Sequence, residues 1–220
     1  MGTITRNAAN NFTTGGVILP AGINDTSVAS ITELENTATG GGAMTLISEQ
    51  TASASASISF TTGIDSTYPI YKFEFINIHP STDNTSFQIN FRDGGSSFDA
   101  IKTTTFFETY HYESDASNLR YDANNLDLAQ STSAQIISNF LSNDNDASTN
   151  GTVYLYSPSS TTFVKHFISV SQGSWSGSAS INNYVAGYCN TTVAIDGVQF
   201  AMSSGNIDSG TIKLYGISGS

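Results

Sequence analysis

The stretch Tyr71-Lys72-Phe73-Glu74-Phe75 alternates strictly between aromatic and charged side chains. Successive side chains of a β-strand point to opposite faces, so this order places three rings on one face and two charges on the other. The stretch from Phe87 to Arg92 repeats the pattern, with Phe87, Ile89 and Phe91 in phase. Both stretches predict strands of an antiparallel sheet that packs one face against a core and turns the other to water.

Similar strand patterns recur along the chain from residue 43 onward, separated by turn-forming residues and without intervening helices. We expect a long polar loop at 115–130 and some helical character at 134–141. This organisation predicts an all-β fold, an antiparallel β-sandwich of jelly-roll type, with an immunoglobulin-like sandwich as the nearest alternative. The expected strands are 51–58, 71–75, 87–91, 98–112, 152–156, 161–170, 174–181, 184–189, 193–202 and 211–217.

Residues 1–42 differ from the rest in pattern. They combine a polar stretch with one short apolar anchor, Val17-Ile18-Leu19-Pro20, and end on three consecutive glycines, Gly40 to Gly42. Proline lacks a backbone donor and glycine permits many dihedral angles, so both interrupt regular structure. We predict an extended N-terminal arm over 1–42, reaching across neighbouring subunits, followed by a β-sandwich domain over 43–220. A first strand pair of the same domain is the alternative.

The composition excludes several classes of protein. The 220 residues hold 7 Lys+Arg against 18 Asp+Glu, a net charge of -11, which is too few cations for a nucleic-acid face. The 33 Ser, 27 Thr and 19 Asn disfavour helices, while 38% hydrophobic and 11% aromatic residues disfavour disorder. No apolar run is long enough for membrane insertion, and the amino terminus lacks the apolar centre of a signal peptide. We therefore expect synthesis in a cytosol without its own export signal.

One group of ionisable residues could support catalysis or metal binding. His111, Glu113 and Asp115 alternate, and a pair of carboxylates could act as acid and base in glycoside hydrolysis. Alternating polar residues at the end of a strand are equally typical of a solvated edge, which is the interpretation we favour. The further carboxylates close by in the sequence are Glu108, Asp122 and Asp127.

The stretch from Asn143 to Gly151 resembles a calcium-binding loop, with spaced oxygens at Asp144, Asp146, Ser148 and Asn150. The EF-hand spacing requires glycine at Thr149 and glutamate at Leu155, and neither is present. A surface turn explains the same residues. His79 and His166 lack partners at metal-ligand spacing, and Cys189 is expected to be a small buried side chain. We assign no catalytic residue, metal ligand or cofactor.

Aromatic residues could form a platform for a sugar, because the C–H face of a sugar stacks on a ring. Such residues are equally common in half-buried strands and in subunit interfaces. The candidates are Trp175, Tyr110, Tyr112, Tyr154, Tyr156 and Tyr184.

Four stretches resemble structural proteins of tailed bacteriophages, especially those of marine phages. The most specific is Met202 to Ile217 (MSSGNIDSGTIKLYGI), followed by Ala43 to Ser48 (AMTLIS), Phe75 to Pro80 (FINIHP) and Tyr188 to Thr192 (YCNTT). The resemblance implies a non-enzymatic virion component with a β-sandwich body. It brings no catalytic residues with it.

We therefore expect a virion protein that is assembled in the host cytoplasm, most simply a capsid decoration or cement protein that stabilises the head from its outer surface. The expected partners are further copies of the chain, in a homo-oligomer such as a trimer, and the major capsid protein or other virion proteins. The sparse lysines favour the same interpretation, because few charges then protect exposed strand edges. The alternative is a receptor-binding tip or a head or tail fibre protein that contacts host-surface glycans.

Overall fold

The computed structural model describes residues 44–121 and 126–218, and within these ranges the protein is all-β without a helix. The predicted arm, residues 1–42, lies outside the described residues. No described helix could cross a membrane. The strands are β1 (Met44–Thr51), β2 (Ser57–Phe60), β3 (Ile70–Pro80), β4 (Thr85–Arg92), β5 (Lys102–Tyr112), β6 (Ser117–Tyr121), β7 (Gln135–Leu141), β8 (Thr149–Tyr156), β9 (Lys165–Trp175), β10 (Ala179–Cys189), β11 (Gly197–Met202) and β12 (Ile207–Ile217).

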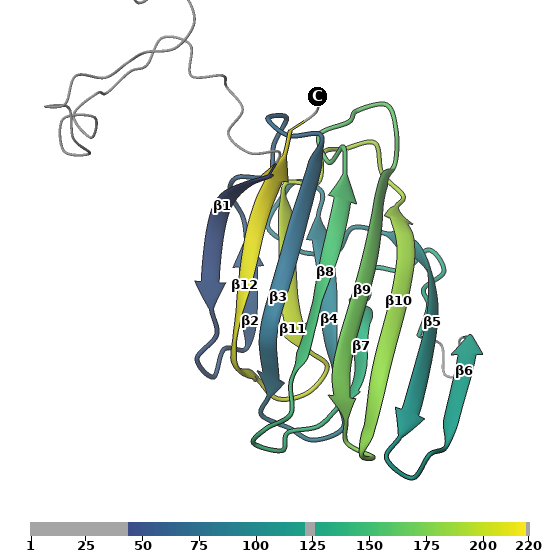
Figure 1. Ribbon diagram of the computed structural model, residues 1–220. Coiled ribbons are helices and arrows are strands. Elements are labelled where there is room, and N and C mark those ends of the chain that lie inside the picture. The colour runs from purple at the N-terminus through teal and green to yellow at the C-terminus, as the bar shows by residue number, and fades with distance from the viewer. Residues whose placement is uncertain (1–43, 122–125, 219–220) are drawn as a thin grey trace, which may run out of the picture. The chain divides into compact units, whose positions relative to one another are not determined.

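The strands form one antiparallel sheet that folds back on itself. Eight strands pair in the order β1-β12-β3-β8-β9-β10-β5-β6, and four pair in the order β2-β11-β4-β7. The two groups join where β7 meets β9 through the single residue pair Leu141 and Trp175. Figure 1 shows β2, β11, β4 and β7 behind the larger group. The sheet is thus nearly closed into a barrel-like shape, as an antiparallel all-β prediction allows.

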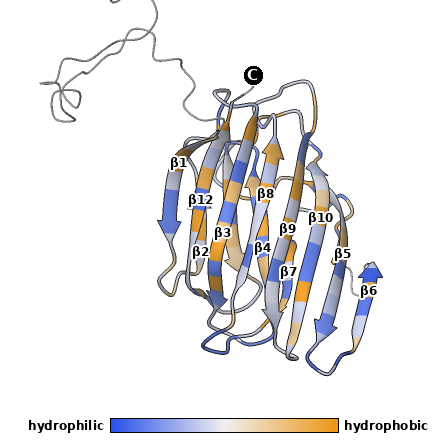
Figure 2. Ribbon diagram, viewed as in Figure 1, coloured by the Kyte–Doolittle hydropathy of each residue, from blue (hydrophilic) through white to orange (hydrophobic). Residues whose placement is uncertain are grey.

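Aromatic residues from both groups of strands fill the space between them. Phe73 of β3 meets Phe60 of β2 with ring centroids 5.4 Å apart, and Phe75 meets Phe87 of β4 at 5.3 Å. Both contacts are edge-on, the arrangement that ring quadrupoles favour. The alternation predicted for Tyr71 to Phe75 is confirmed, because its three rings are fully buried. Figure 2 shows the alternation as hydrophobic and hydrophilic bands along β3.

The strand predicted over 51–58 is wrong. The chain leaves β1 at Thr51 and begins β2 at Ser57, with Ala54 at a φ of 49° between them. Between Thr51 and Ile58 the stretch alternates only between alanine and serine, and of these small side chains only Ala52 reaches the core. Backbone bonds to β12 hold it instead, since Ser55 and Ile207 exchange N–H···O bonds of 2.8 Å.

Three further predictions need correction. The stretch 134–141 is the strand β7 rather than a helix, because burial of Ile137 and Leu141 in the core overrides local propensity. The loop expected at 115–130 contains β6, which pairs with β5. The single strand expected over 174–181 is a hairpin, in which Ser178 at a φ of 58° closes the turn by donating its N–H to the carbonyl oxygen of Trp175.

Candidate functional site

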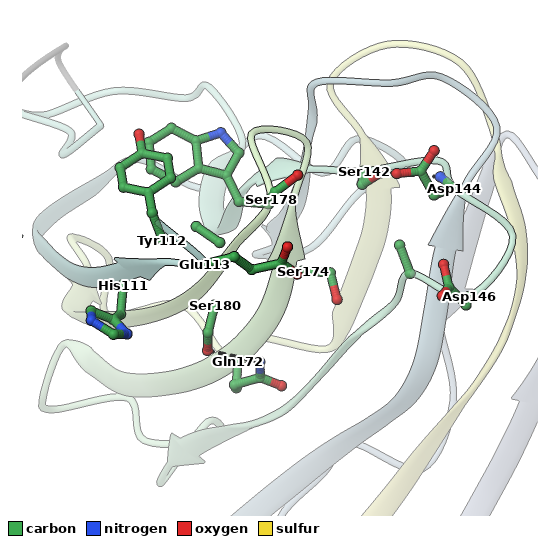
Figure 3. Close-up of a pocket in the computed structure, with 13 residues that line it drawn as sticks. His111, Tyr112, Glu113, Ser142, Asp144, Asp146, Gln172, Ser174, Ser178 and Ser180 are labelled. Atoms are coloured by element: carbon green, nitrogen blue, oxygen red, sulfur yellow. Dashed lines mark hydrogen bonds between the residues drawn. The ribbon is translucent and has the colours of Figure 1, made fainter. Parts of the chain in front are cut away.

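A polar hollow of about 600 Å³ lies at the end of the sheet where β5, β9 and β10 turn. His111, Tyr112 and Glu113 reach it from the end of β5 and the residue that follows. Gln172, Ser174 and Trp175 of β9 form a second wall, and the loop after β7 supplies Ser142, Asp144 and Asp146. Figure 3 shows the two aspartates on the opposite side of the hollow from His111 and Tyr112. The structure thus brings together members of three groups that lie apart in the sequence, namely the acid/base candidates, the calcium-like loop and the aromatic platform.

Of the predicted acid/base residues that the structure describes, His111 and Glu113 line this hollow. Asp115 lies beyond the end of β5 in an exposed turn, and its carboxylate is 3.3 Å from Nε2 of His111. Asp127 accepts a hydrogen bond from the hydroxyl of Tyr121 at 3.3 Å. Asp122 lies outside the described residues. The predicted group is therefore divided, because β5 ends before the alternation is complete.

Glu108 points to the interior and has a structural role. It lies on the opposite face of β5 from His111 and is fully buried. Its carboxylate forms an ion pair with the guanidinium of Arg120 on β6. The same guanidinium lies 5.2 Å from the ring of Phe140 and 5.5 Å from that of Tyr110. Burial with a satisfied partner, rather than catalysis, explains this charge.

Two of the four residues that the predicted calcium loop offers are engaged by the protein itself. Oδ2 of Asp144 accepts a hydrogen bond from the hydroxyl of Ser142 at 2.9 Å. Oδ1 of Asn150 accepts one from the backbone N–H of Asn77 at 2.7 Å. Among the described residues, no three His, Cys, Asp or Glu side chains come close enough to hold a metal ion. The loop is a turn that leads into β8.

The predicted aromatic platform separates into three groups. Trp175 is stacked on Phe140, with centroids 5.0 Å apart, and also contacts Tyr110 and Tyr112 at 4.8 and 5.3 Å. The other three tyrosines lie elsewhere on the sheet. The rings around Trp175 therefore pack mainly on one another. Sequence reasoning missed Phe140, because nothing local indicates that a residue at a φ of 54° turns its ring toward β9.

The histidines left without metal partners lie in two different settings. Nε2 of His79 is 3.1 Å from the backbone oxygen of Asp144, and Nδ1 is 3.7 Å from the carboxylate of Asp208. His166 is exposed on β9 beside Tyr188, with ring centroids 6.0 Å apart.

Two lysines and the cysteine form a buried row across β5, β10 and β9. Cys189 pairs with Lys102 on one side and with Lys165 on the other, and all three are fully buried. Nζ of Lys102 donates to the carbonyl of Ser133 at 2.7 Å, and Nζ of Lys165 donates to that of Thr191 at 3.0 Å. Burial lowers the pKa of Lys102 to about 8, lowers the pKa of Lys165, and raises the pKa of Cys189 to about 12.

The hollow offers hydroxyl, amide and carboxylate groups, which suit hydrogen bonding to a polyhydroxylated ligand. Nε2 of Gln172 already donates to the carbonyl of Gly173 at 3.2 Å and contacts Ser180 Oγ at 3.4 Å, while the carboxylate of Glu113 is exposed. Comparison with known proteins gave no match to a family model, to a curated protein or to a solved structure.

Proposed function

We propose that this chain is a non-enzymatic virion structural protein of a tailed bacteriophage, assembled in the host cytoplasm. Its role in this proposal is that of a capsid decoration protein, which binds the outer capsid surface as a homo-oligomer, such as a trimer, and stabilises the head. The major capsid protein is its partner, and neither nucleic acid nor membrane insertion has a part in its function.

The observation that carries this proposal is where the resembling stretches lie. Residues 44–48 belong to β1, 75–80 to β3 and 207–217 to β12, and these strands are neighbours in the order β1-β12-β3. Leu46 of β1 pairs with Tyr215 of β12, which pairs in turn with Lys72 of β3. Three of the four stretches, far apart in the sequence, thus contribute neighbouring strands to one block of the sheet. The fourth resembling stretch, Tyr188 to Thr192, lies apart from this block at the end of β10.

The proposal includes a sandwich body of jelly-roll type. Two strand orders support it, β1-β12-β3-β8 in the larger group and β2-β11-β4-β7 in the smaller one. The chain passes from one group to the other at every connection except β5 to β6, β8 to β9 and β9 to β10. Two Greek keys of four strands each produce such an alternation. The hairpins β5-β6 and β9-β10 extend the larger sheet.

The test is a reconstruction of the whole virion, with the chain placed into its density. Density for the β body on the outer capsid lattice is the expected result. Heads that lack the protein should rupture at lower temperature than complete heads, and adding the full chain back should restore them. A position on the tail, or absence from the particle, would overturn the decoration role.

A second candidate function is that of a receptor-binding tip or fibre protein, favoured by the polar hollow beside Trp175. The isolated protein would then adsorb to host cells through a surface glycan. Glu113→Ala and Gln172→Ala should reduce adsorption at least about tenfold if each removes a hydrogen bond to the ligand. A substitution of Trp175 is a poorer probe, because this residue packs against Phe140 and Tyr112. Equal adsorption by both variants and the wild type would exclude the hollow as the glycan-binding site.

A further inference from the structure

The outer face of the eight-stranded group is divided into a charged half and an uncharged half. The charged half lies on β1, β12 and β3, where Lys72 is 3.2 Å from Glu74 and Lys213 is 3.4 Å from Glu49. Register places Glu74 opposite Lys213, so these charges form one group of alternating sign. This half also exposes Leu46 and Ile76, and what distinguishes it is its set of paired charges.

The other half, which we call the uncharged face, consists of the outward-pointing residues of β8, β9, β10 and β5. Burial alternates along β9, and the cross-strand register then fixes the outward positions of its neighbours. None of the residues is an aspartate, glutamate, lysine or arginine, although the chain carries a net charge of -11. They are Asn150, Thr152, Tyr154, Tyr156, His166, Ile168, Val170, Gln172, Ser174, Ser180, Asn182, Tyr184, Ala186, Tyr188, Thr103, Thr105, Phe107, Thr109 and His111.

In this region the usual distribution of polar and apolar residues is reversed at a few positions, although Phe106 and Phe167 still face the core. The inward positions of β5 and β9 include Lys102, Glu108 and Lys165, all fully buried. Their outward positions include Phe107 and Ile168, which are 41% and 45% exposed. A strand that is solvated on one face normally turns its charges to water and its apolar side chains to the core. Charges turned inward while apolar side chains point outward favour an outward side that is covered by a partner.

The uncharged face is not flat, because it has a ridge and a hollow. The rings of Phe107 and Tyr184 are stacked, with centroids 4.7 Å apart and planes within 7°, and Val170 lies next in the same row. Beside this ridge is a hollow of about 470 Å³ around Ala186, whose small side chain leaves the sheet uncovered. A ridge and a hollow side by side on one face can fit their counterparts on an identical face.

We infer that the uncharged face binds a second copy of this chain. Copies with a net charge of -11 repel each other, and a face without carboxylates is where they can approach most closely. Three strands of the face have eleven residues each, and with β8 they cover roughly 700 Å² at about 4.8 Å between strands and about 3.4 Å per residue. Each partner in a standard protein interface contributes about 800 Å². The inference deepens the proposed assembly, on which it rests, by naming the surface through which copies meet.

The test compares two substitutions of similar exposure on the same sheet. Val170 is 37% exposed in the uncharged face, and Ile76 is 36% exposed on β3 in the charged half. We measure the mass of the full chain by light scattering and its dissociation constant by sedimentation. The wild type and Ile76→Lys should form an oligomer whose mass is a whole multiple of 23.2 kDa. Val170→Lys should raise the dissociation constant at least about 100-fold, because it buries an unpaired ammonium.

A second variant and the salt dependence of association also test whether copies meet through the uncharged face. Ala186→Lys, which fills the hollow, should have the same effect and replaces Val170→Lys if that variant does not fold. Added salt should tighten the wild-type association, because it screens the repulsion between copies. A monomeric wild type, a Val170→Lys oligomer as stable as that of Ile76→Lys, or dissociation by salt would overturn the inference. An oligomer that depends on this face but is absent from virions would contradict the proposed function instead.

Discussion

Replacing Lys102 with methionine is expected to stabilise the protein at pH 7. Lys102 is fully buried on β5, and burial lowers its pKa from 10.5 to about 8. A pKa unit corresponds to about 1.4 kcal/mol, so keeping this lysine charged in the folded state costs about 3 kcal/mol. Methionine fills much of the same volume without the charge. It loses the 2.7 Å hydrogen bond to the carbonyl of Ser133, which contributes about 1 kcal/mol. The net gain in the free energy of unfolding is therefore about 2 kcal/mol.

The gain should disappear as the pH rises. Between pH 8 and 10.5 the unfolded chain still holds the proton that folded Lys102 has lost, so the wild type becomes more stable with pH in this window. The full cost is present below pH 8 and is absent above 10.5, where only the lost hydrogen bond remains and Lys102→Met is the less stable protein. Cys189 contributes the opposite slope, because its folded pKa is raised to about 12. Both proteins contain Cys189, so its contribution largely cancels in the difference.

The assay is urea unfolding followed by the fluorescence of Trp175, the only tryptophan, at several values between pH 7 and 10.5. Lys213→Met is the control, because Lys213 forms a partly exposed ion pair with Glu49 and its loss should change stability by less than about 1 kcal/mol. A destabilised Lys102→Met protein at pH 7, or a gain that stays constant over the pH range, would refute the reasoning.

Three further substitutions test other parts of the structure by the same unfolding assay. Glu108→Gln should cost about 3 kcal/mol, because it leaves the guanidinium of Arg120 without its carboxylate; a loss below about 1 kcal/mol would contradict a buried ion pair. Phe200→Ala should cost about 4 kcal/mol, since its ring contacts three others in the core, and a smaller loss would mean that the core collapses into the cavity. Gly210→Ala should cost about 2 kcal/mol, because its φ is 118° and a Cβ would lie 2.6 Å from a backbone oxygen of β3. The control is Gly95→Ala, where φ is 77° and nothing lies within 4 Å; equal losses at both glycines would point to strain alone.

The all-β fold could be predicted from the sequence because its signal is local. In Tyr71 to Phe75, three rings alternate with two charges, so the period of two is unambiguous and the burial follows from it. In Gln135–Leu141, the propensities are mixed, and the strand exists because β4 and the core hold it in place. That information belongs to partners far along the chain, and no local pattern contains it.

The candidate site was less predictable for a similar reason. Its walls come from β5, β9 and the loop after β7, which only the folded sheet brings together. The burial of Glu108 had a signal, since it is in phase with the buried Phe106. Phe107 obscured this signal, because with two adjacent rings the sequence does not show whether Phe106 or Phe107 faces the core. The structure resolves this ambiguity by burying Phe106 and exposing Phe107.

The four lysines are divided equally between the interior and the charged half of the outer face. A chain with four lysines was expected to leave strand edges unprotected. Lys102 and Lys165 lie in the interior, and Lys72 and Lys213 lie in the charged half of the outer face. No lysine is therefore left for the outward positions of β8, β9, β10 and β5, which form the uncharged face. If the lysines of β5 and β9 pointed outward, the free-energy cost of burying an ammonium would be avoided. For Lys102 alone this cost is about 3 kcal/mol. That the chain buries them and exposes Phe107 instead is most simply explained if the outer face of these strands is itself an interior, shared with another copy.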